Sequence, residues 1–203
     1  MRKTLGLILV SLFTVPALAH FEIEARQTSC KRATAQEIAR VNEGNKKLKA
    51  FVKACVKKTG SEEWCNQLTR PNPESYDIFK CTYGANQPHM LIHPDETTWG
   101  FAFEAVKLVQ ELEARNVGVC LVYNWWRPEP YNQNVGGAAA RHPFGTSIDV
   151  AFCTKAEQQK AHAVLCELRS HGRLRALGEY PGTGLHLGVG DTRDNTWGKP
   201  CPL

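Results

Sequence analysis

The sequence predicts one α+β domain that is stapled by disulfide bonds. Three short apolar runs, at residues 117–123, 147–152 and 184–190, have the length and the β-branched content of buried strands. Helical periodicities lie before and between these runs, and 203 residues are enough for one domain with a substantial core. The chain also contains eight cysteines, and an even number in an exported protein favours four disulfides.

The N-terminal residues predict export. Arg2 and Lys3 precede an apolar stretch from Leu5 to Pro16, and small residues then occupy the positions that a signal peptidase reads. The stretch is shorter than the about 20 residues that a membrane-spanning helix needs. We therefore expect residues 1–19 to be a cleaved signal peptide, with a retained anchor as the alternative. The product should be periplasmic or extracellular, without a membrane span, and monomeric.

Charge excludes little but disfavours nucleic acid as a partner. Without Arg2 and Lys3 the net charge falls from +5 to +3, and no dense basic arm is present. This weak positive charge would allow attraction to an anionic polymer such as a cell wall.

The cysteines are expected to be fully paired. Cys55 and Cys65 flank a turn at Gly60 and form the pair that local sequence favours, whereas the other pairings stay open. A zinc site made of cysteines is disfavoured, because the sequence contains no Cys-x-x-Cys motif.

The first region, residues 20–94, is predicted to be helical and to carry several of the cysteines. Thr34 and Glu37 form a capping box at the start of an apolar periodicity that predicts a helix over 34–57. A shorter helix is expected over 61–68, and a loop-rich passage with prolines follows to about residue 94.

The second region, residues 95–203, is expected to be the functional core. One apolar face predicts a helix between residues 95 and 116, just before the first predicted strand. Residues 155–170 form another helical segment, which Gly172 closes. Because no long linker separates the two regions, we expect them to form one compact domain.

Polar side chains interrupt two of the three apolar runs. Asp149 lies in the middle of 147–152, and His186 lies in the middle of 184–190. A buried carboxylate costs several kcal/mol unless a cation or hydrogen-bond donors compensate, and a buried imidazole also needs a partner. Each residue alone is compatible with an ordinary hydrogen-bonded role. Together with His142, which precedes a glycine-containing turn, they favour a metal site with three protein ligands.

His89 and His93 are competing ligand candidates. Their spacing of four would place both on one face of a helix. Pro88 and Pro94 flank the pair and leave little room for a helix, so we expect loop histidines here.

Two longer segments carry a family resemblance. RPEPYNQNVGGAAARHPFGTSIDVAF and the later LGEYPGTGLHLGVGDTRDNTWG resemble the zinc D-alanyl-D-alanine peptidases of the M15 type. The bacterial branch carries Arg-x-x-x-Tyr-Asn, Val-Gly-Gly-Ala, His-x-x-Gly-x-x-x-Asp and a later histidine in a strand. The matching residues are Arg127, Tyr131, Asn132, Val135, Gly136, Gly137, Ala138, His142, Gly145, Asp149 and His186. The match covers about residues 117–198, and the region before residue 90 has no counterpart.

The resemblance implies a fold, a cofactor and an activity. The fold would be a small, mostly antiparallel sheet with helices packed on one side, as in hedgehog and DD-peptidase domains. Zn²⁺ would be bound by His142, Asp149 and His186. The activity would be that of a secreted zinc peptidase, a DD-carboxypeptidase or endopeptidase acting on peptidoglycan stem peptides.

The resemblance also implies roles for the segment before the first ligand. Arg127 would bind the substrate or polarise its carbonyl, since its guanidinium offers a fixed fork of donors. Tyr131 and Asn132 would help to bind the substrate. The alternative for Arg127 is a surface side chain stacked on Trp125 or Trp126.

The sequence departs from the family around the metal. Ala140 replaces a usual serine, and Thr183 and Gly188 occupy the positions where an acid beside the second histidine is expected. That acid would be the general base, and its loss would slow hydrolysis by about 10²–10⁴-fold. We expect Glu179 to replace it and Asp191 to cap the end of the last strand. Without a base, the scaffold would be a non-catalytic protein that binds cell-wall peptides or metal.

Overall fold

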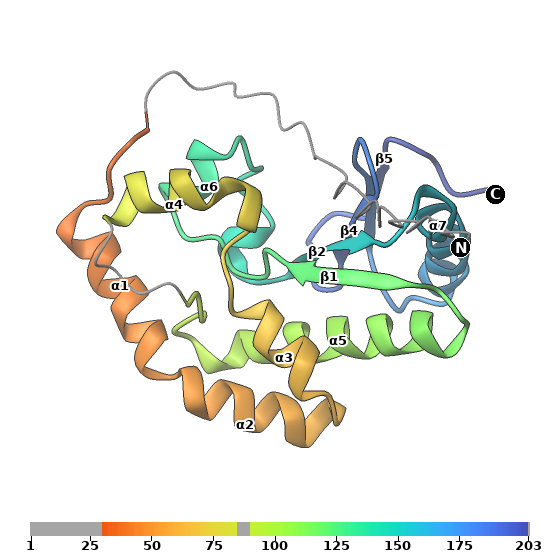
Figure 1. Cartoon of the computed structure of the whole chain (residues 1–203), viewed down its shortest axis with the longest axis horizontal. Helices are drawn as coiled ribbons and strands as arrows, with labels where there is room; N and C mark the ends of the chain where they lie inside the picture. Colours follow the sequence, from red (N-terminus) through yellow and green to blue (C-terminus); the bar gives the residue numbers. More distant parts are fainter. Residues whose placement is uncertain (1–29, 85–89, 203) are drawn as a thin grey trace, which may run out of the picture.

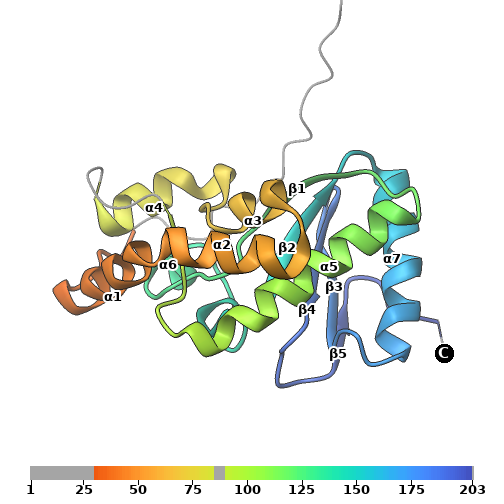
Figure 2. The same ribbon diagram turned by 90° about the horizontal axis from the view of Figure 1, so that it is seen from below.

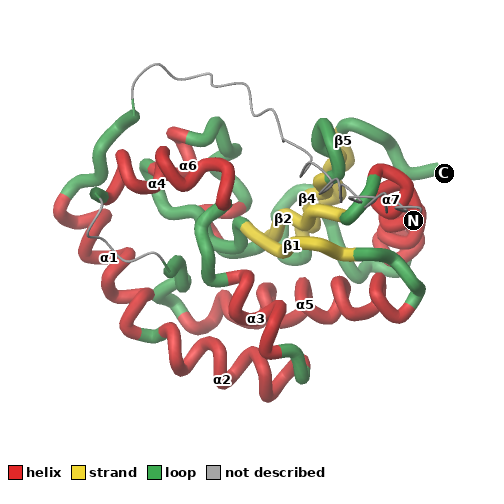
Figure 3. The backbone as a smooth tube through the Cα atoms, in the orientation of Figure 1, coloured by secondary structure: helices red, strands yellow, loops and turns green. Residues whose placement is uncertain are grey.

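The computed structural model describes residues 30–84 and 90–202 (Figure 1). The predicted signal peptide and His89 lie outside the described residues. Helices and one small sheet make up the described chain, so the predicted α+β class is confirmed. Figure 3 shows the strands gathered together between α7 (Lys155–Ser170) and the N-terminal helices. Within the described ranges, no helix is both long and apolar enough to cross a bilayer.

The N-terminal region is helical, but the passage to about residue 94 that we expected to be loop-rich also contains helices. Its elements are α1 (Ala35–Lys46), α2 (Leu48–Thr59), α3 (Glu62–Leu68), the 3-10 helix η1 (Pro73–Ser75) and α4 (Tyr76–Tyr83). The capping box is confirmed: the Thr34 side chain accepts from the Glu37 backbone N–H, and the Glu37 carboxylate accepts from the Thr34 N–H.

One predicted helix is in fact two. The chain breaks at Lys47, between α1 and α2, where the periodicity had predicted a continuous helix over 34–57. Near the break, Gly44 packs directly on the carbonyl of Ile92, where a Cβ atom would lie 1.8 Å from the oxygen. Lys47 also donates through Nζ to the Pro94 carbonyl at 2.7 Å. These contacts fix the end of α1 against the segment that leads into the core.

The sheet contains five strands in the order β1-β2-β4-β3-β5. They are β1 (Val119–Tyr123), β2 (Ser147–Phe152), β3 (Ala176–Glu179), β4 (Gly184–Gly188) and β5 (Asn195–Trp197). The sheet is mixed, because β3 and β5 pair in parallel whereas the other neighbours are antiparallel. The three predicted strands are confirmed with small differences at their ends; β3 and β5 were not predicted.

Two long helices, α5 (Trp99–Ala114) and α7, pack against the sheet (Figure 2). The observed bounds of α7 are the predicted ones. The connection between β1 and β2 contains two short helices, α6 (Tyr131–Asn134) and the 3-10 helix η3 (His142–Phe144). The 3-10 helix η2 (Glu96–Thr98) precedes α5.

Buried residues of both predicted regions share one apolar core. Phe51 of α2 stacks on Trp125, with ring centroids 4.7 Å apart, and meets Trp99 of α5 edge to face. The N-terminal helices therefore support the segment after β1 that leads to the candidate site.

All eight cysteines are paired, as predicted. The bonds are Cys30–Cys81, Cys55–Cys65, Cys120–Cys153 and Cys166–Cys201. The expected local pair across the turn at Gly60 is among them. The last bond ties the segment after β5 to α7, so the edge of the sheet is covalently anchored.

Candidate metal centre and ligand cavity

A single row of residues across the sheet forms the floor of the site. Tyr123 pairs with Asp149, Asp149 with His186, His186 with Gly178, and Gly178 with Trp197. Register partners in a sheet point to the same face. The strand pairing therefore places Asp149 and His186 side by side on one face of the sheet. Tyr123 and Trp197 lie at the two ends of the same row.

His142 reaches this row from a loop outside the sheet. It begins η3, and the two preceding tryptophans hold that loop in place. Trp125 Nε1 donates to the Gly145 carbonyl at 2.7 Å, and Trp126 Nε1 donates to the Pro143 carbonyl at 3.2 Å. The imidazole is buried and lies at the cavity.

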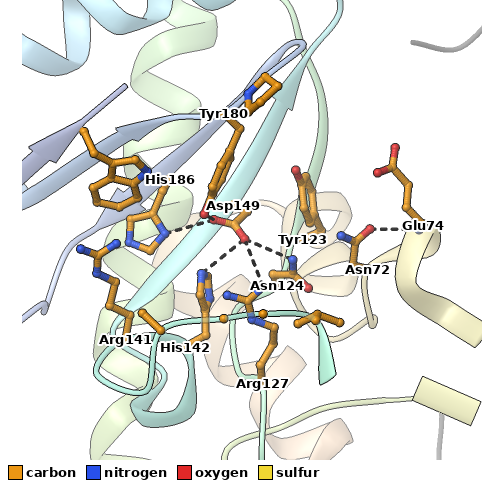
Figure 4. Close-up of a pocket in the computed structure, with 16 residues that line it drawn as sticks. Asn72, Glu74, Tyr123, Asn124, Arg127, Arg141, His142, Asp149, Tyr180 and His186 are labelled. Carbon is orange, nitrogen blue, oxygen red and sulfur yellow. Dashed lines mark hydrogen bonds and ion pairs between the residues drawn. The ribbon is translucent and has the colours of Figure 1, made fainter. Parts of the chain in front are cut away.

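The structure brings the predicted triad together (Figure 4). His142, Asp149 and His186 are all buried, and each offers a ligand atom within 4.8 Å of the others. His142 Nε2 lies 3.3 Å from Asp149 Oδ2, and His186 Nδ1 lies 3.1 Å from Asp149 Oδ1. This group could hold a metal ion.

The outer nitrogen of each imidazole faces a fixed acceptor. His142 Nδ1 lies 3.1 Å from the Trp125 carbonyl, and His186 Nε2 lies 3.2 Å from Asp191 Oδ2. With a metal bound, these outer nitrogens would carry the protons, which would leave the lone pairs of His142 Nε2 and His186 Nδ1 for the cation. His142 Nε2 is buried and makes no hydrogen bond. A cation among these atoms would satisfy it, and outer acceptors of this kind are usual for metal-binding histidines.

The electrostatics favour the protonation states that a metal requires. Burial lowers the pKa of His142 to about 4, and the Arg127 charge acts in the same direction. Burial alone would raise the pKa of Asp149, but His142, His186 and Arg127 outweigh it and hold that pKa well below its usual range. Near neutral pH the structure thus presents a neutral imidazole beside an ionised carboxylate.

Asp149 also receives two neutral hydrogen bonds. Asn124 Nδ2 donates to Oδ2 at 3.1 Å, and the Tyr180 hydroxyl donates to Oδ1 at 3.0 Å. Burial and the Asp149 charge raise the pKa of Tyr180 well above its usual range, so the hydroxyl remains a donor. These hydrogen bonds help to offset the desolvation cost of a carboxylate in a buried strand.

Asp191 has a different role from the expected strand cap. Its buried carboxylate accepts from His186 and from Thr146 Oγ1, the latter at 2.8 Å, and lies 3.5 Å from Arg141 Nε. A Cβ atom on Gly188 would lie 2.4 Å from Asp191 Oδ2, so the glycine leaves the space that the carboxylate fills. Asp191 therefore lies behind His186, as an outer partner of the imidazole.

Glu179 does not approach the triad. Gly178 lies in the site row, and successive side chains of a strand point to opposite faces, so Glu179 points away from the row. Its carboxylate instead accepts from Lys155 Nζ, at the start of α7, at 2.8 Å. The turn after Glu179 leads into the antiparallel β3–β4 pair rather than back to the metal site, so the structure does not support the expected position of a base.

A cavity of about 340 Å³ opens beside the triad. Arg127 lines it, and its buried side chain places Nη1 3.9 Å from Asp149 Oδ2. The alternative of a surface arginine is therefore wrong.

Tyr131 and Asn132 are buried and lie outside the cavity lining. The Tyr131 hydroxyl bonds to Ser75 Oγ at 2.9 Å, and Asn132 Nδ2 donates to the Gly137 and Ala138 carbonyls. A Cβ atom on Gly137 would lie 2.1 Å from Asn132 Oδ1. These residues shape the loop before His142 instead of contacting a ligand, which corrects their expected role.

Two other histidine groups are poor ligand sets. His93 is buried, and its Nδ1 accepts from the Asp95 backbone N–H at 3.1 Å. His162 lies close to Cys166 and Cys201, but both sulfur atoms are already joined in a disulfide.

Among the described residues, the cluster of His142, Asp149 and His186 is therefore the best candidate for a metal-binding function. Comparisons with known protein families, curated proteins and solved structures found no match to this chain. The resemblance to M15 peptidases therefore remains a prediction that rests on the ordered motifs.

Several cavity residues were not anticipated from the sequence. They are Glu74, Tyr123, Asn124, Arg141, Tyr180 and Trp197. Tyr123 could have been found, because it ends a predicted strand. The others depend on loops and on the unpredicted β5, and no local pattern marks them.

Proposed function

We propose that the protein is a secreted zinc-dependent peptidase that cleaves peptidoglycan stem peptides. The main support is the buried triad, in which two imidazole nitrogens and an ionised carboxylate converge beside a cavity. Three protein ligands of this kind, with a position left open, are typical of catalytic zinc. The motif resemblance to M15 peptidases points the same way and would give the chain their hedgehog-like fold. Secretion is supported by the predicted signal peptide and by the four disulfides.

The residues present fit zinc chemically. Zinc at His142, Asp149 and His186 would acidify a bound water and polarise a peptide carbonyl. The Trp125 carbonyl and the Asp191 carboxylate would accept the protons of the outer imidazole nitrogens when the inner nitrogens bind zinc. The fold therefore holds the three ligand residues close together.

Arg127 is the residue best placed to act on the substrate. It lines the cavity beside the triad and its Nε atom is buried without a hydrogen bond. A guanidinium so placed can donate to a substrate carbonyl oxygen or to a terminal carboxylate. With Arg141 in the same lining, the cavity suits a short peptide that carries a negative charge.

A second candidate function follows from the missing base. Among the described residues, the carboxylates that line the cavity belong to Asp149 and Glu74. Asp149 would be a metal ligand, Glu179 points away, and Asp191 lies behind His186. A protein that binds wall peptides or metal without cutting would have this arrangement.

Incubation with peptidoglycan separates the two. The mature protein is loaded with zinc, incubated with purified sacculi with and without a chelator, and the released fragments are analysed by mass. Cleavage that the chelator abolishes supports the peptidase. Co-sedimentation with sacculi without cleavage supports the binding protein. If the protein neither cleaves nor co-sediments, both functions are rejected.

A further inference from the structure

The cavity carries opposite charges at its two ends. Figure 4 shows Glu74 at one end and Arg141 at the other, with Asp149 between them. Asn72 and Tyr123 line the wall on the Glu74 side of the triad. A ligand that spans the triad therefore meets an acid on one side and a guanidinium on the other.

The Arg141 end is held rigidly. The guanidinium carbon lies 3.9 Å from the centre of the Trp197 ring, and Nε lies 3.5 Å from Asp191 Oδ2. Trp197 in turn lies against Gly178, where a Cβ atom would come within 2.0 Å of the indole. The position of this positive charge is thus fixed by the edge of the sheet.

The Glu74 end is held by the N-terminal region. Glu74 lies in η1, where its backbone N–H donates to Asn72 Oδ1 at 3.0 Å. The next residue, Ser75, is buried and bonds to Tyr131. The backbone is therefore anchored on both sides, while the Glu74 residue is exposed at the cavity. Its negative charge acts on the cavity wall: burial, the Asp149 charge and the Glu74 charge together raise the pKa of Tyr123.

We propose that Glu74 is a specificity residue that selects ligands carrying an ammonium group on the side of the triad opposite Arg141. This inference rests on the proposed function, since it assumes that a peptide occupies the cavity. Opposite charges across the site would also fix the direction of the peptide, with its carboxylate end toward Arg141 and its ammonium toward Glu74. Reversal would bring like charges together at both ends.

A peptide can supply the ammonium from two sources, its α-amine or a lysine-type side chain. Three tripeptides ending in D-alanyl-D-alanine distinguish them: one with a free lysine side chain and an acetylated α-amine, one with the reverse, and one acetylated at both. Dissociation constants are measured by calorimetry on the zinc-loaded full mature protein, together with kcat/KM wherever cleavage occurs.

The wild type should prefer one amine-bearing peptide over the doubly acetylated one by roughly two- to fivefold, the strength of an exposed ion pair. Glu74→Gln should bring this ratio to about one. Asp77→Asn is the matched control, because Asp77 is an exposed acid three residues away that pairs with Lys80 and lies outside the cavity lining. It should keep the wild-type ratio.

Different results overturn different statements. Peptides that bind or are cleaved with the same preference in Glu74→Gln as in the wild type would reject the role of Glu74 alone. A wild-type ratio of one would do the same. If none of the peptides binds, the proposed function fails together with this inference. Selective binding without cleavage would support the role of Glu74 and reject the peptidase.

Discussion

Substitution of Asp191 tests whether the outer hydrogen bond of His186 strengthens zinc binding at the proposed site. In Asp191→Asn, the side-chain oxygen should still face His186 Nε2 and Arg141 Nε, because both are donors that now approach Oδ2 at 3.2 and 3.5 Å. Thr146 can rotate its hydroxyl to accept from the new amide. The imidazole tautomer is then kept and only the negative charge is lost.

The expected loss follows from the type of bond removed. A hydrogen bond to a buried charge contributes about 1.5–3 kcal/mol, and loss of an outer partner typically weakens metal binding by about 10–100-fold. We expect about tenfold weaker zinc binding in Asp191→Asn. We expect about 100-fold in Asp191→Ala, which removes the acceptor as well.

Competition with a chelator of known zinc affinity measures the effect. Thermal unfolding of the metal-free variants separates lost binding from lost folding. Asp194→Asn is the control, because Asp194 is an exposed acid that pairs with Arg169. Unchanged zinc affinity in Asp191→Ala, with the fold intact, would refute the assignment of Asp191 as an outer partner.

Four further results are expected. Glu179→Gln should keep zinc and activity, because it removes only a partly exposed ion pair with Lys155; a large loss of activity would restore Glu179 as a base. Arg127→Lys should keep one zinc but lower kcat/KM by about 10²-fold, because the fork of donors is lost; unchanged kinetics would exclude Arg127 from the reaction. Replacing Cys166 and Cys201 by serine should lower the free energy of unfolding by about 4 kcal/mol, since it opens a loop with a sequence separation of 35, and urea titration checks this. Metal-free protein should lose stability as the pH falls from about 6.5 to 4, by about 3 kcal/mol, because the unfolded His142 binds its proton first; a flat profile in that window would contradict its burial as a neutral ring.

The two strand residues of the triad, Asp149 and His186, could be predicted because they stand out locally. Asp149 and His186 interrupt β2 and β4, which are otherwise apolar, and the observed register makes them direct partners. Burying a polar residue in a strand costs free energy unless it has a partner, so a polar residue inside an apolar run can be recognised from the sequence alone.

The surroundings of the triad depend on tertiary register and could not be predicted. Glu179 was expected near the metal because of the turn that follows it, but the pairing of Gly178 with His186 decides which face it takes. Asp191 reaches His186 only because Gly188 lacks a side chain there.

The unpredicted strands have the same explanation. β5 is short and half exposed, and its place beside β3 depends on Trp197 packing over Gly178. Such a contact leaves no periodic pattern in the sequence. The break between α1 and α2 likewise has no helix-breaking residue at Lys47 to mark it, and it lies beside the contact of Gly44 with Ile92.

The most direct test of the account is zinc stoichiometry by elemental analysis after dialysis against trace metal. The wild type should retain one zinc per chain, and His186→Ala should retain none while its disulfides keep it folded. His93→Ala is the matched control, because His93 is a buried histidine outside the triad, and it should retain one. A wild type without zinc, or zinc kept in His186→Ala and lost in His93→Ala, would contradict the metal centre.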